Sequence, residues 1–327
     1  MEFDSGSTIF IAHKTKRRIH CATTGVFKRH PANYRKLDEG SNMFSKLWRK
    51  IVLGLGLLAG QSFGAEEPKL NIPGAKENIE FSAPGGVSLT LDAHVPDGPG
   101  PFATCILVHG GGWINGNKRV YITPLFEPLT KAGFVWFTIN YRLAPAHRWP
   151  DCGDDVTAAV KWVKAHAAEY KVDPKRIALI GESAGAHLVA WVGTQNDPET
   201  RVAAVVPFYL PGDLELQTKK TGKIDAPLVA LLNVTELDDA ARKTLRAASP
   251  IDQIKPGLPP FLLIHGDHDV TVPYEQSTLF QAKMKAAGNV CDLITIPGGA
   301  HGMGGWDKLK SDYREQLVKW LHDKIGN

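Results

Sequence analysis

The sequence predicts an α/β fold in which a mostly parallel sheet of about eight strands is flanked by helices. Three observations lead to this prediction. From about residue 79 onward, short runs of β-branched and other apolar residues alternate with longer segments of helical periodicity. Glycine-rich segments follow several of the apolar runs. The 327 residues are 43% hydrophobic and 22% charged, which is an ordinary globular composition for one large domain.

The expected elements follow in order along the chain. Residues 88–95 alternate apolar and polar side chains and predict a strand near the sheet edge. Continuous apolar runs predict buried strands at 104–108, 134–139, 176–180, 202–206, 261–264 and 291–296. Apolar residues at helical spacing predict helices over 154–169, 184–192, 275–287 and 308–324.

Residues 210–249 interrupt this alternation. They contain no buried-strand run and favour two helices, around 228–232 and 236–247. An insertion of this kind between sheet strands predicts a small helical cap above the strand ends. We therefore expect residues 65–327 to form one domain that carries its cap at about 210–249.

The positive charge is confined to the start of the chain. Residues 1–64 hold 11 of the 38 Lys and Arg residues but only 4 of the 34 acidic residues, so the net charge of +4 comes from them. The remainder is close to neutral for its size. It has no basic stripe, so nucleic acid is not an expected partner.

Residues 43–64 have the pattern of a secretory signal peptide. A basic segment at 43–50 precedes an apolar run at 51–60, and Ser62 and Gly64 stand at the −3 and −1 positions before Ala65. The run is too short to span a bilayer, so no stable membrane insertion is expected after cleavage. We predict export to the periplasm or the extracellular space.

Residues 1–42 are polar and basic and precede a signal that begins naturally at Met43. They are interpreted as an over-extended reading frame or a disordered leader, with a long n-region or an organelle-targeting segment as alternatives.

Once the leader is removed, the cysteines that remain are Cys105, Cys152 and Cys291, and their spacing is not that of a metal site. Cys105 and Cys291 are expected in the core. The sequence does not decide whether two of the three cysteines form a disulfide.

The strongest chemical signal is Gly181-Glu182-Ser183-Ala184-Gly185, which fits the pattern G-x-S-x-G. It lies between a predicted strand and a predicted helix, the context that this nucleophile turn requires. Small flanking residues permit a sharp turn that exposes the serine hydroxyl. The following helix N-terminus favours developing negative charge.

A second signal, His109-Gly110-Gly111-Gly112-Trp113, ends the strand predicted at 104–108. Successive glycines allow backbone N–H groups to approach a ligand, as an oxyanion hole requires. A flexible turn is the alternative. A phosphate loop is disfavoured because the Lys-Ser/Thr ending is missing.

A serine nucleophile needs a base, and the base needs an acid that orients it. His301 follows the last predicted strand, and Asp267 and Asp269 follow the strand before it. Because parallel strands end at one edge of the sheet, these loops are expected to converge on Ser183. A histidine base predicts activity that rises through roughly pH 6 to 8.

Taken together, the motifs resemble the hormone-sensitive-lipase-like carboxylesterase and acetyl esterase branch of the α/β-hydrolase superfamily. Besides the two glycine motifs, the segments 140–145, 148–150, 154–156 and 269–273 match that branch. The resemblance covers residue 80 to the end. It implies Ser183, Asp269 and His301 as the catalytic residues. It also implies backbone N–H donors from Gly111, Gly112 and Ala184, without metal or organic cofactor.

The expected function is hydrolysis of short-chain carboxylic esters through an acyl-enzyme, with a small-molecule or carbohydrate ester as the partner. Acetyl and feruloyl esters of carbohydrates are candidate substrates. An arylformamidase or peptidase would use the same triad, and a non-catalytic binding module on this fold is a further alternative. Trp113, Trp149 and Trp306 are candidates for the substrate pocket, with packing between cap and core as the alternative.

Overall fold

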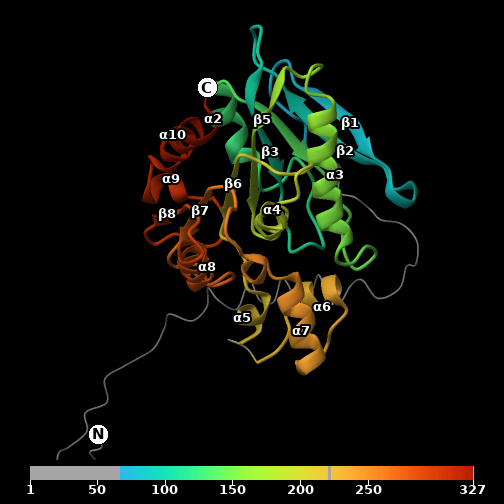
Figure 1. Ribbon diagram of the computed structural model, residues 1–327, viewed down its shortest axis with the longest axis vertical. Coiled ribbons are helices and arrows are strands. Elements are labelled where there is room, and N and C mark those ends of the chain that lie inside the picture. The colour runs from blue at the N-terminus through green and yellow to red at the C-terminus, as the bar shows by residue number, and fades with distance from the viewer. Residues whose placement is uncertain (1–66, 220–221, 327) are drawn as a thin grey trace, which may run out of the picture. The chain divides into compact units, whose positions relative to one another are not determined.

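The computed structural model describes residues 67–219 and 222–326. The predicted leader at 1–42 and signal peptide at 43–64 lie outside the described residues. Within the described part, the fold class predicted from the sequence is confirmed: one eight-stranded, mostly parallel sheet is flanked by helices (Figure 1). No helix of this part is both long enough and apolar enough to cross a membrane.

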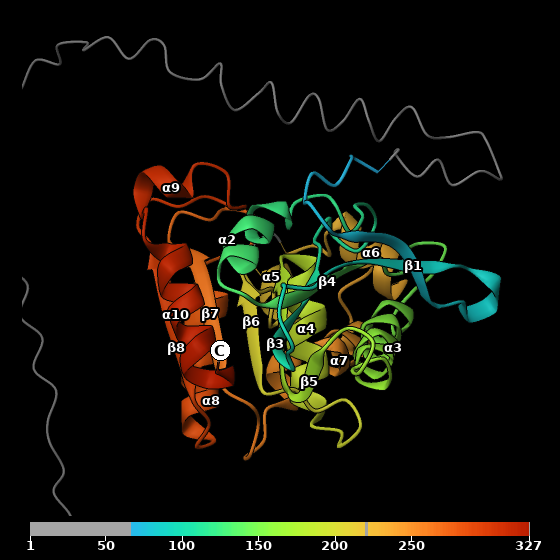
Figure 2. The same ribbon diagram turned by 90° about the horizontal axis from the view of Figure 1, so that it is seen from above.

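The sheet has the order β1-β2-β4-β3-β5-β6-β7-β8, and Figure 2 shows it running from β8 on the left to β1 on the right. The pairs β1–β2 and β2–β4 are antiparallel, and the remaining pairs are parallel. The strands are β1 (Lys76–Ser82), β2 (Leu89–His94), β3 (Phe102–Val108), β4 (Val135–Ile139), β5 (Val172–Glu182), β6 (Ala204–Phe208), β7 (Phe261–Gly266) and β8 (Cys291–Ile296).

Helices cover both faces of the sheet, and each face has its own apolar core. The apolar side chains of α2, α9 and α10 belong to the core on one face, and those of α3, α4 and α8 belong to the core on the other. The helices are α2 (Phe126–Lys131), α3 (Asp151–Ala165), α4 (Ala184–Gln195), α5 (Leu214–Lys219), α6 (Ala226–Leu232), α7 (Asp239–Ala248), α8 (Glu275–Ala286), α9 (Trp306–Leu309) and α10 (Tyr313–Ile325). Short 3-10 turns occur at η1 (Pro84–Gly86), η2 (Thr123–Leu125) and η3 (Pro250–Gln253).

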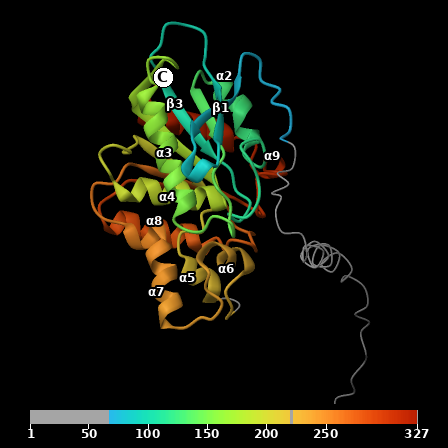
Figure 3. The same ribbon diagram turned by 90° about the vertical axis from the view of Figure 1, so that its right-hand side faces the viewer.

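Residues 210–249, the predicted cap, contain α5, α6 and α7. They form a group of helices at one end of the sheet (Figures 1 and 3). The two helices expected there correspond to α6 and α7. The six residues of α5 are too few to produce a periodic apolar pattern, which explains why the sequence did not predict this helix.

Three further elements differ from expectation for physical reasons. The edge strand β1 was not predicted because its residues are mostly exposed and carry no apolar run. The helix α2 is as short as α5. The closing helix, predicted from residue 308, begins only at Tyr313, because the backbone of Lys310 leaves the helical region at φ −148° and ψ 83°.

A buried ion cluster fixes the loop that follows β3. The side chain of Lys118 is fully buried and pairs with Glu67 and Asp92. Arg119 donates to Asp92 through Nε over 2.6 Å. Buried charges are stable only when paired and hydrogen-bonded, so this cluster ties the loop to β2 and to residue 67 at the start of the described chain. Cys105 and Cys291 lie in the core as predicted, and no described cysteine forms a disulfide.

Candidate active site

Ser183 occupies the turn between β5 and α4. Its φ of 53° and ψ of −118° are values that residues with a side chain rarely adopt. The turn requires glycine on both sides. A Cβ on Gly181 would overlap the carbonyl of Gly185, and a Cβ on Gly185 would overlap the carbonyl of Val108. The Ser183 N–H donates to the carbonyl of Phe208 on β6 over 3.0 Å, which fixes the turn at the end of the central strands.

His301 and Asp269 complete a hydrogen-bonded chain with this serine. The Oγ of Ser183 lies 3.0 Å from Nε2 of His301, and Nδ1 of His301 lies 2.7 Å from Oδ2 of Asp269. An ionised carboxylate can only accept, so the proton of neutral His301 belongs on Nδ1. That tautomer leaves Nε2 free to accept the proton of Ser183, as a general base must.

The carboxylate of Asp269 is held by several donors. Its Oδ1 accepts from the backbone N–H groups of Thr271 and Val272 over 2.8 and 2.9 Å, and Nε2 of His265 lies 3.4 Å from Oδ2. Burial by itself raises the pKa of Asp269. The contacts with His265, His301 and Val272 outweigh burial and hold the pKa below its ordinary value of 3.8. The group therefore stays ionised at neutral pH.

Asp267 was the other candidate acid from the sequence motif. Its side chain points away from His301. It is exposed, and its Oδ1 accepts from the N–H of Gly298 over 2.7 Å. The structure therefore brings Asp269, and not Asp267, into contact with His301.

The loop after β3 presents the glycine N–H groups. Gly111 has φ 100° and Gly112 has φ 62°, and neither N–H has a partner among the described residues. Ala184 is the first residue of α4, where backbone N–H groups lack intrahelical acceptors. The three groups singled out by the resemblance are thus free to donate, and Gly112 and Ala184 line the same cavity as Ser183.

Glu182 links the nucleophile turn to the glycine loop. No sequence signal pointed to this role, because the position of Glu182 in G-x-S-x-G accepts any residue. Its buried carboxylate accepts from the N–H of Gly110 and from the hydroxyl of Tyr209. Burial raises the pKa of Glu182, and these two hydrogen bonds partly offset the rise. The ring centroid of Tyr209 lies 4.7 Å from that of His301. Glu182 therefore connects the nucleophile turn to the glycine loop directly and to His301 through Tyr209.

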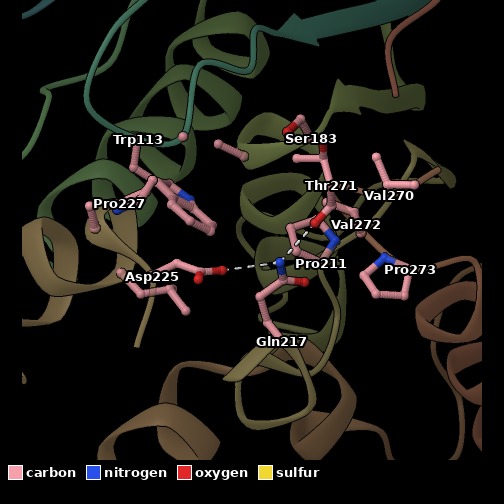
Figure 4. A pocket seen from close by; sticks show the side chains of 14 residues that line it. Trp113, Ser183, Pro211, Gln217, Asp225, Pro227, Val270, Thr271, Val272 and Pro273 are labelled. Atoms are coloured by element: carbon pink, nitrogen blue, oxygen red, sulfur yellow. Dashed lines mark hydrogen bonds between the residues drawn. The ribbon is translucent and has the colours of Figure 1, made fainter. Parts of the chain in front are cut away.

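A cavity of about 630 Å³ opens beside Ser183, within the size range of sites for small ligands (Figure 4). Most of its wall is apolar, and besides Ser183 its polar side chains are those of Gln217, Asp225 and Thr271. The lining residues are Gly112, Trp113, Ser183, Ala184, Pro211, Gln217, Asp225, Ala226, Pro227, Leu228, Val270, Thr271, Val272 and Pro273.

Of the three candidate tryptophans, only Trp113 lines the cavity. The ring of Trp149 packs edge-on against Trp191 and His187. The backbone N–H of Trp149 donates to the carbonyl of Leu231 in α6, so this residue joins core and cap. Trp306 is fully buried, and its Nε1–H donates to the carbonyl of Ala300 over 3.0 Å. The structure therefore places both outside the cavity lining and in packing contacts, which was the alternative for them. Sequence position does not show which way a side chain turns from its loop.

Comparisons with known proteins agree with this geometry. The sequence profile of the family described as BD-FAE matches residues 91–284, more than half of the chain. The "Probable carboxylic ester hydrolase LipM" of Mycobacterium tuberculosis is 37% identical over 188 residues, which are 54% of this chain and 44% of that protein. The "Acetylxylan esterase" of Xylanibacter ruminicola is 28% identical over 240 residues, covering 69% of this chain and 46% of that protein.

Among solved structures, "Truncated form of carbohydrate esterase from gut microbiota" superposes with a TM-score of 0.68 at 26% identity. That alignment covers 81% of this chain and 99% of the other chain. The chain thus spans about half the length of the two curated relatives and nearly all of this solved structure.

We expect Asp269→Asn to lower kcat for p-nitrophenyl acetate about 10⁴-fold, because an amide holds His301 in the wrong tautomer. The folded-state pKa of Asp269 lies below 3.8, so the native carboxylate is ionised at every pH above that value. Because the variant also loses the carboxylate beside His301, the two proteins need not share a pH profile, so their kcat values are compared at one fixed pH between 7 and 8. A variant kcat within tenfold of the wild-type value would contradict the assignment.

We also expect Gly111→Ala to lower kcat about 10²- to 10³-fold, the usual cost of losing an oxyanion donor. Its φ of 100° disfavours a side chain, and the new Cβ would overlap the carbonyl of Asn115 and displace the loop. Gly304→Ala is the matched control, since nothing lies within 4 Å of its Cβ position. Equal kcat values for the two variants would show that the glycine loop does not stabilise the reaction.

Proposed function

This chain belongs to the BD-FAE family of α/β-hydrolase esterases, and from that premise we propose that it is a serine carboxylesterase acting on short-chain esters. The observation that supports the proposal best is the hydrogen-bonded series from Ser183 through His301 to Asp269 beside free backbone N–H groups. A binding module has no need for a base placed 3.0 Å from a strained serine.

In the proposed reaction, Ser183 attacks the ester carbonyl while Nε2 of His301 takes its proton. The N–H groups of Gly111, Gly112 and Ala184 stabilise the oxyanion. His301 then returns the proton to the departing alcohol, and the acyl group stays on Ser183. Water attacks the acyl-enzyme with His301 as base, which releases the acid and restores the serine.

Short esters fit the site better than long acyl chains. The cap residues Ala226, Pro227 and Leu228 line the cavity of about 630 Å³ beside Ser183, and the cap itself is small. Among the relatives, one is named an acetylxylan esterase and another a carbohydrate esterase. These names favour acetyl or feruloyl esters of carbohydrates as the natural substrates.

We expect p-nitrophenyl acetate and butyrate to be hydrolysed at least tenfold more efficiently, by kcat/KM, than the octanoate and palmitate. Ser183→Ala should lower kcat by several orders of magnitude for every ester, because no other described nucleophile contacts His301. Both proteins should show the same thermal unfolding midpoint to within a few degrees. Equal activity of the variant and the wild type would refute the serine mechanism, and a preference for palmitate would refute the short-chain proposal.

Export is a separate part of the proposal and rests on the pattern of residues 43–64. We expect the mature protein, recovered from a cell that exports it, to begin at Ala65. N-terminal sequencing by mass spectrometry measures this directly. An intact segment 43–64 on the active protein, retained inside the cell, would contradict export.

A further inference from the structure

Two cap side chains form a polar site in the cavity wall. Gln217 lies on α5, and Asp225 directly precedes α6. The Nε2 of Gln217 donates to Oδ2 of Asp225 over 3.3 Å and to the carbonyl of Thr271 over 2.8 Å, in the loop that follows the catalytic Asp269 (Figure 4). The amide therefore fixes the carboxylate relative to the catalytic loop.

The carboxylate of Asp225 is not used to cap its own helix. An aspartate before a helix normally accepts from a backbone N–H of the first turn. Asp238, in the same position before α7, does so and accepts from Ala241 over 2.7 Å. Asp225 accepts no such bond, and Pro227 in the first turn has no N–H to offer.

Asp225 is also the only charged residue among those that line the cavity. It forms no ion pair with the residues that the structure describes. Beside it, Oε1 of Gln217 is buried without a hydrogen-bond partner in the described chain. Asp225 is only half-buried, but a buried acceptor without a partner, such as Oε1 of Gln217, is unusual and indicates a ligand that brings a hydrogen-bond donor.

The wall around this pair is apolar. Trp113, Pro227 and Val272 lie in it, and the Nε1 of Trp113 lies 3.3 Å from Nδ1 of His187, a contact that restrains the indole. A ligand that fits must combine apolar C–H faces with O–H donors at its edge. Sugar rings and other cyclic polyols have this combination, and a carboxylate can accept from two adjacent hydroxyls at once.

We propose that Gln217 and Asp225 form a recognition site for adjacent hydroxyl groups on the alcohol part of the substrate. The inference rests on the proposed esterase function and names its substrate class as short-acyl esters of sugars or similar polyols. An acetyl group fills only a small part of a cavity of about 630 Å³, which leaves room for the alcohol part beside Gln217 and Asp225. The pair would then add selection of the alcohol to the selection of short acyl groups.

The test compares two acetate esters that share the acyl group and ring size, acetylated methyl xylopyranoside and cyclohexyl acetate. Wild-type kcat/KM should be at least about tenfold higher for the sugar ester. Asp225→Leu should lower the value for the sugar ester about 10- to 100-fold, the usual effect of removing a hydrogen bond to a charged group. The value for cyclohexyl acetate should change less than threefold, and Asp225→Asn should fall between wild type and Asp225→Leu.

Asp238→Leu is the matched control, because it removes the carboxylate before α7, which lies outside the cavity lining. It should lower the unfolding midpoint and leave the preference between the two esters unchanged. As a second measurement, methyl xylopyranoside should inhibit cyclohexyl acetate hydrolysis competitively, and Asp225→Leu should raise its inhibition constant about tenfold or more.

Three outcomes overturn the inference. If wild type hydrolyses both esters equally, or if Asp225→Leu keeps the preference for the sugar ester, the pair does not recognise hydroxyls while the esterase function stands. If acetylcholine is preferred to both esters and Asp225→Leu abolishes that preference, the site binds a cation instead. If no ester is hydrolysed in a Ser183-dependent way, the inference and the proposed function fall together.

Discussion

The strained backbone turn at Ser183 is the constraint on which the rest of the site depends. A positive φ at a residue with a side chain costs on the order of 1–3 kcal/mol and persists only where surrounding contacts enforce it. Here the carbonyl of Phe208 and the close packing of Gly181 and Gly185 against neighbouring backbone enforce it. The hydroxyl is thereby lifted from the end of β5, where the loops after β3, β7 and β8 reach it.

Two buried carboxylates then organise these loops in different ways. Asp269 receives N–H groups from its own loop and contacts from two histidines, which stabilise its charge and hold its pKa low. Glu182 is more deeply buried, and its pKa is raised because fewer donors oppose the cost of burial. Asp269 orients His301 directly. Glu182 instead accepts from the N–H of Gly110 and from the hydroxyl of Tyr209, and the ring of Tyr209 lies against His301.

The cap lies beside the catalytic residues without contacting their reacting atoms. Among residues 210–219 and 222–249, none forms a hydrogen bond with the reacting atoms of Ser183 or His301. Its side chains close one side of the cavity and place Gln217 and Asp225 in the wall. If Gln217 and Asp225 recognise the alcohol as proposed, changes in α5 and α6 should alter which esters are accepted, while the loops after the sheet strands carry the reaction.

The sequence by itself determined the fold class and the convergence of Ser183 and His301, because both follow from local patterns. Apolar runs and helical periodicity reflect burial, and G-x-S-x-G reflects a turn that only small residues permit. The tertiary structure gave Glu182 its role and turned Trp149 and Trp306 away from the cavity. It also placed Asp269 rather than Asp267 against His301, a choice that the family resemblance implied but the local pattern left open. These outcomes depend on the direction that each side chain takes from its loop. Packing against segments distant in sequence sets that direction, and no local pattern records it.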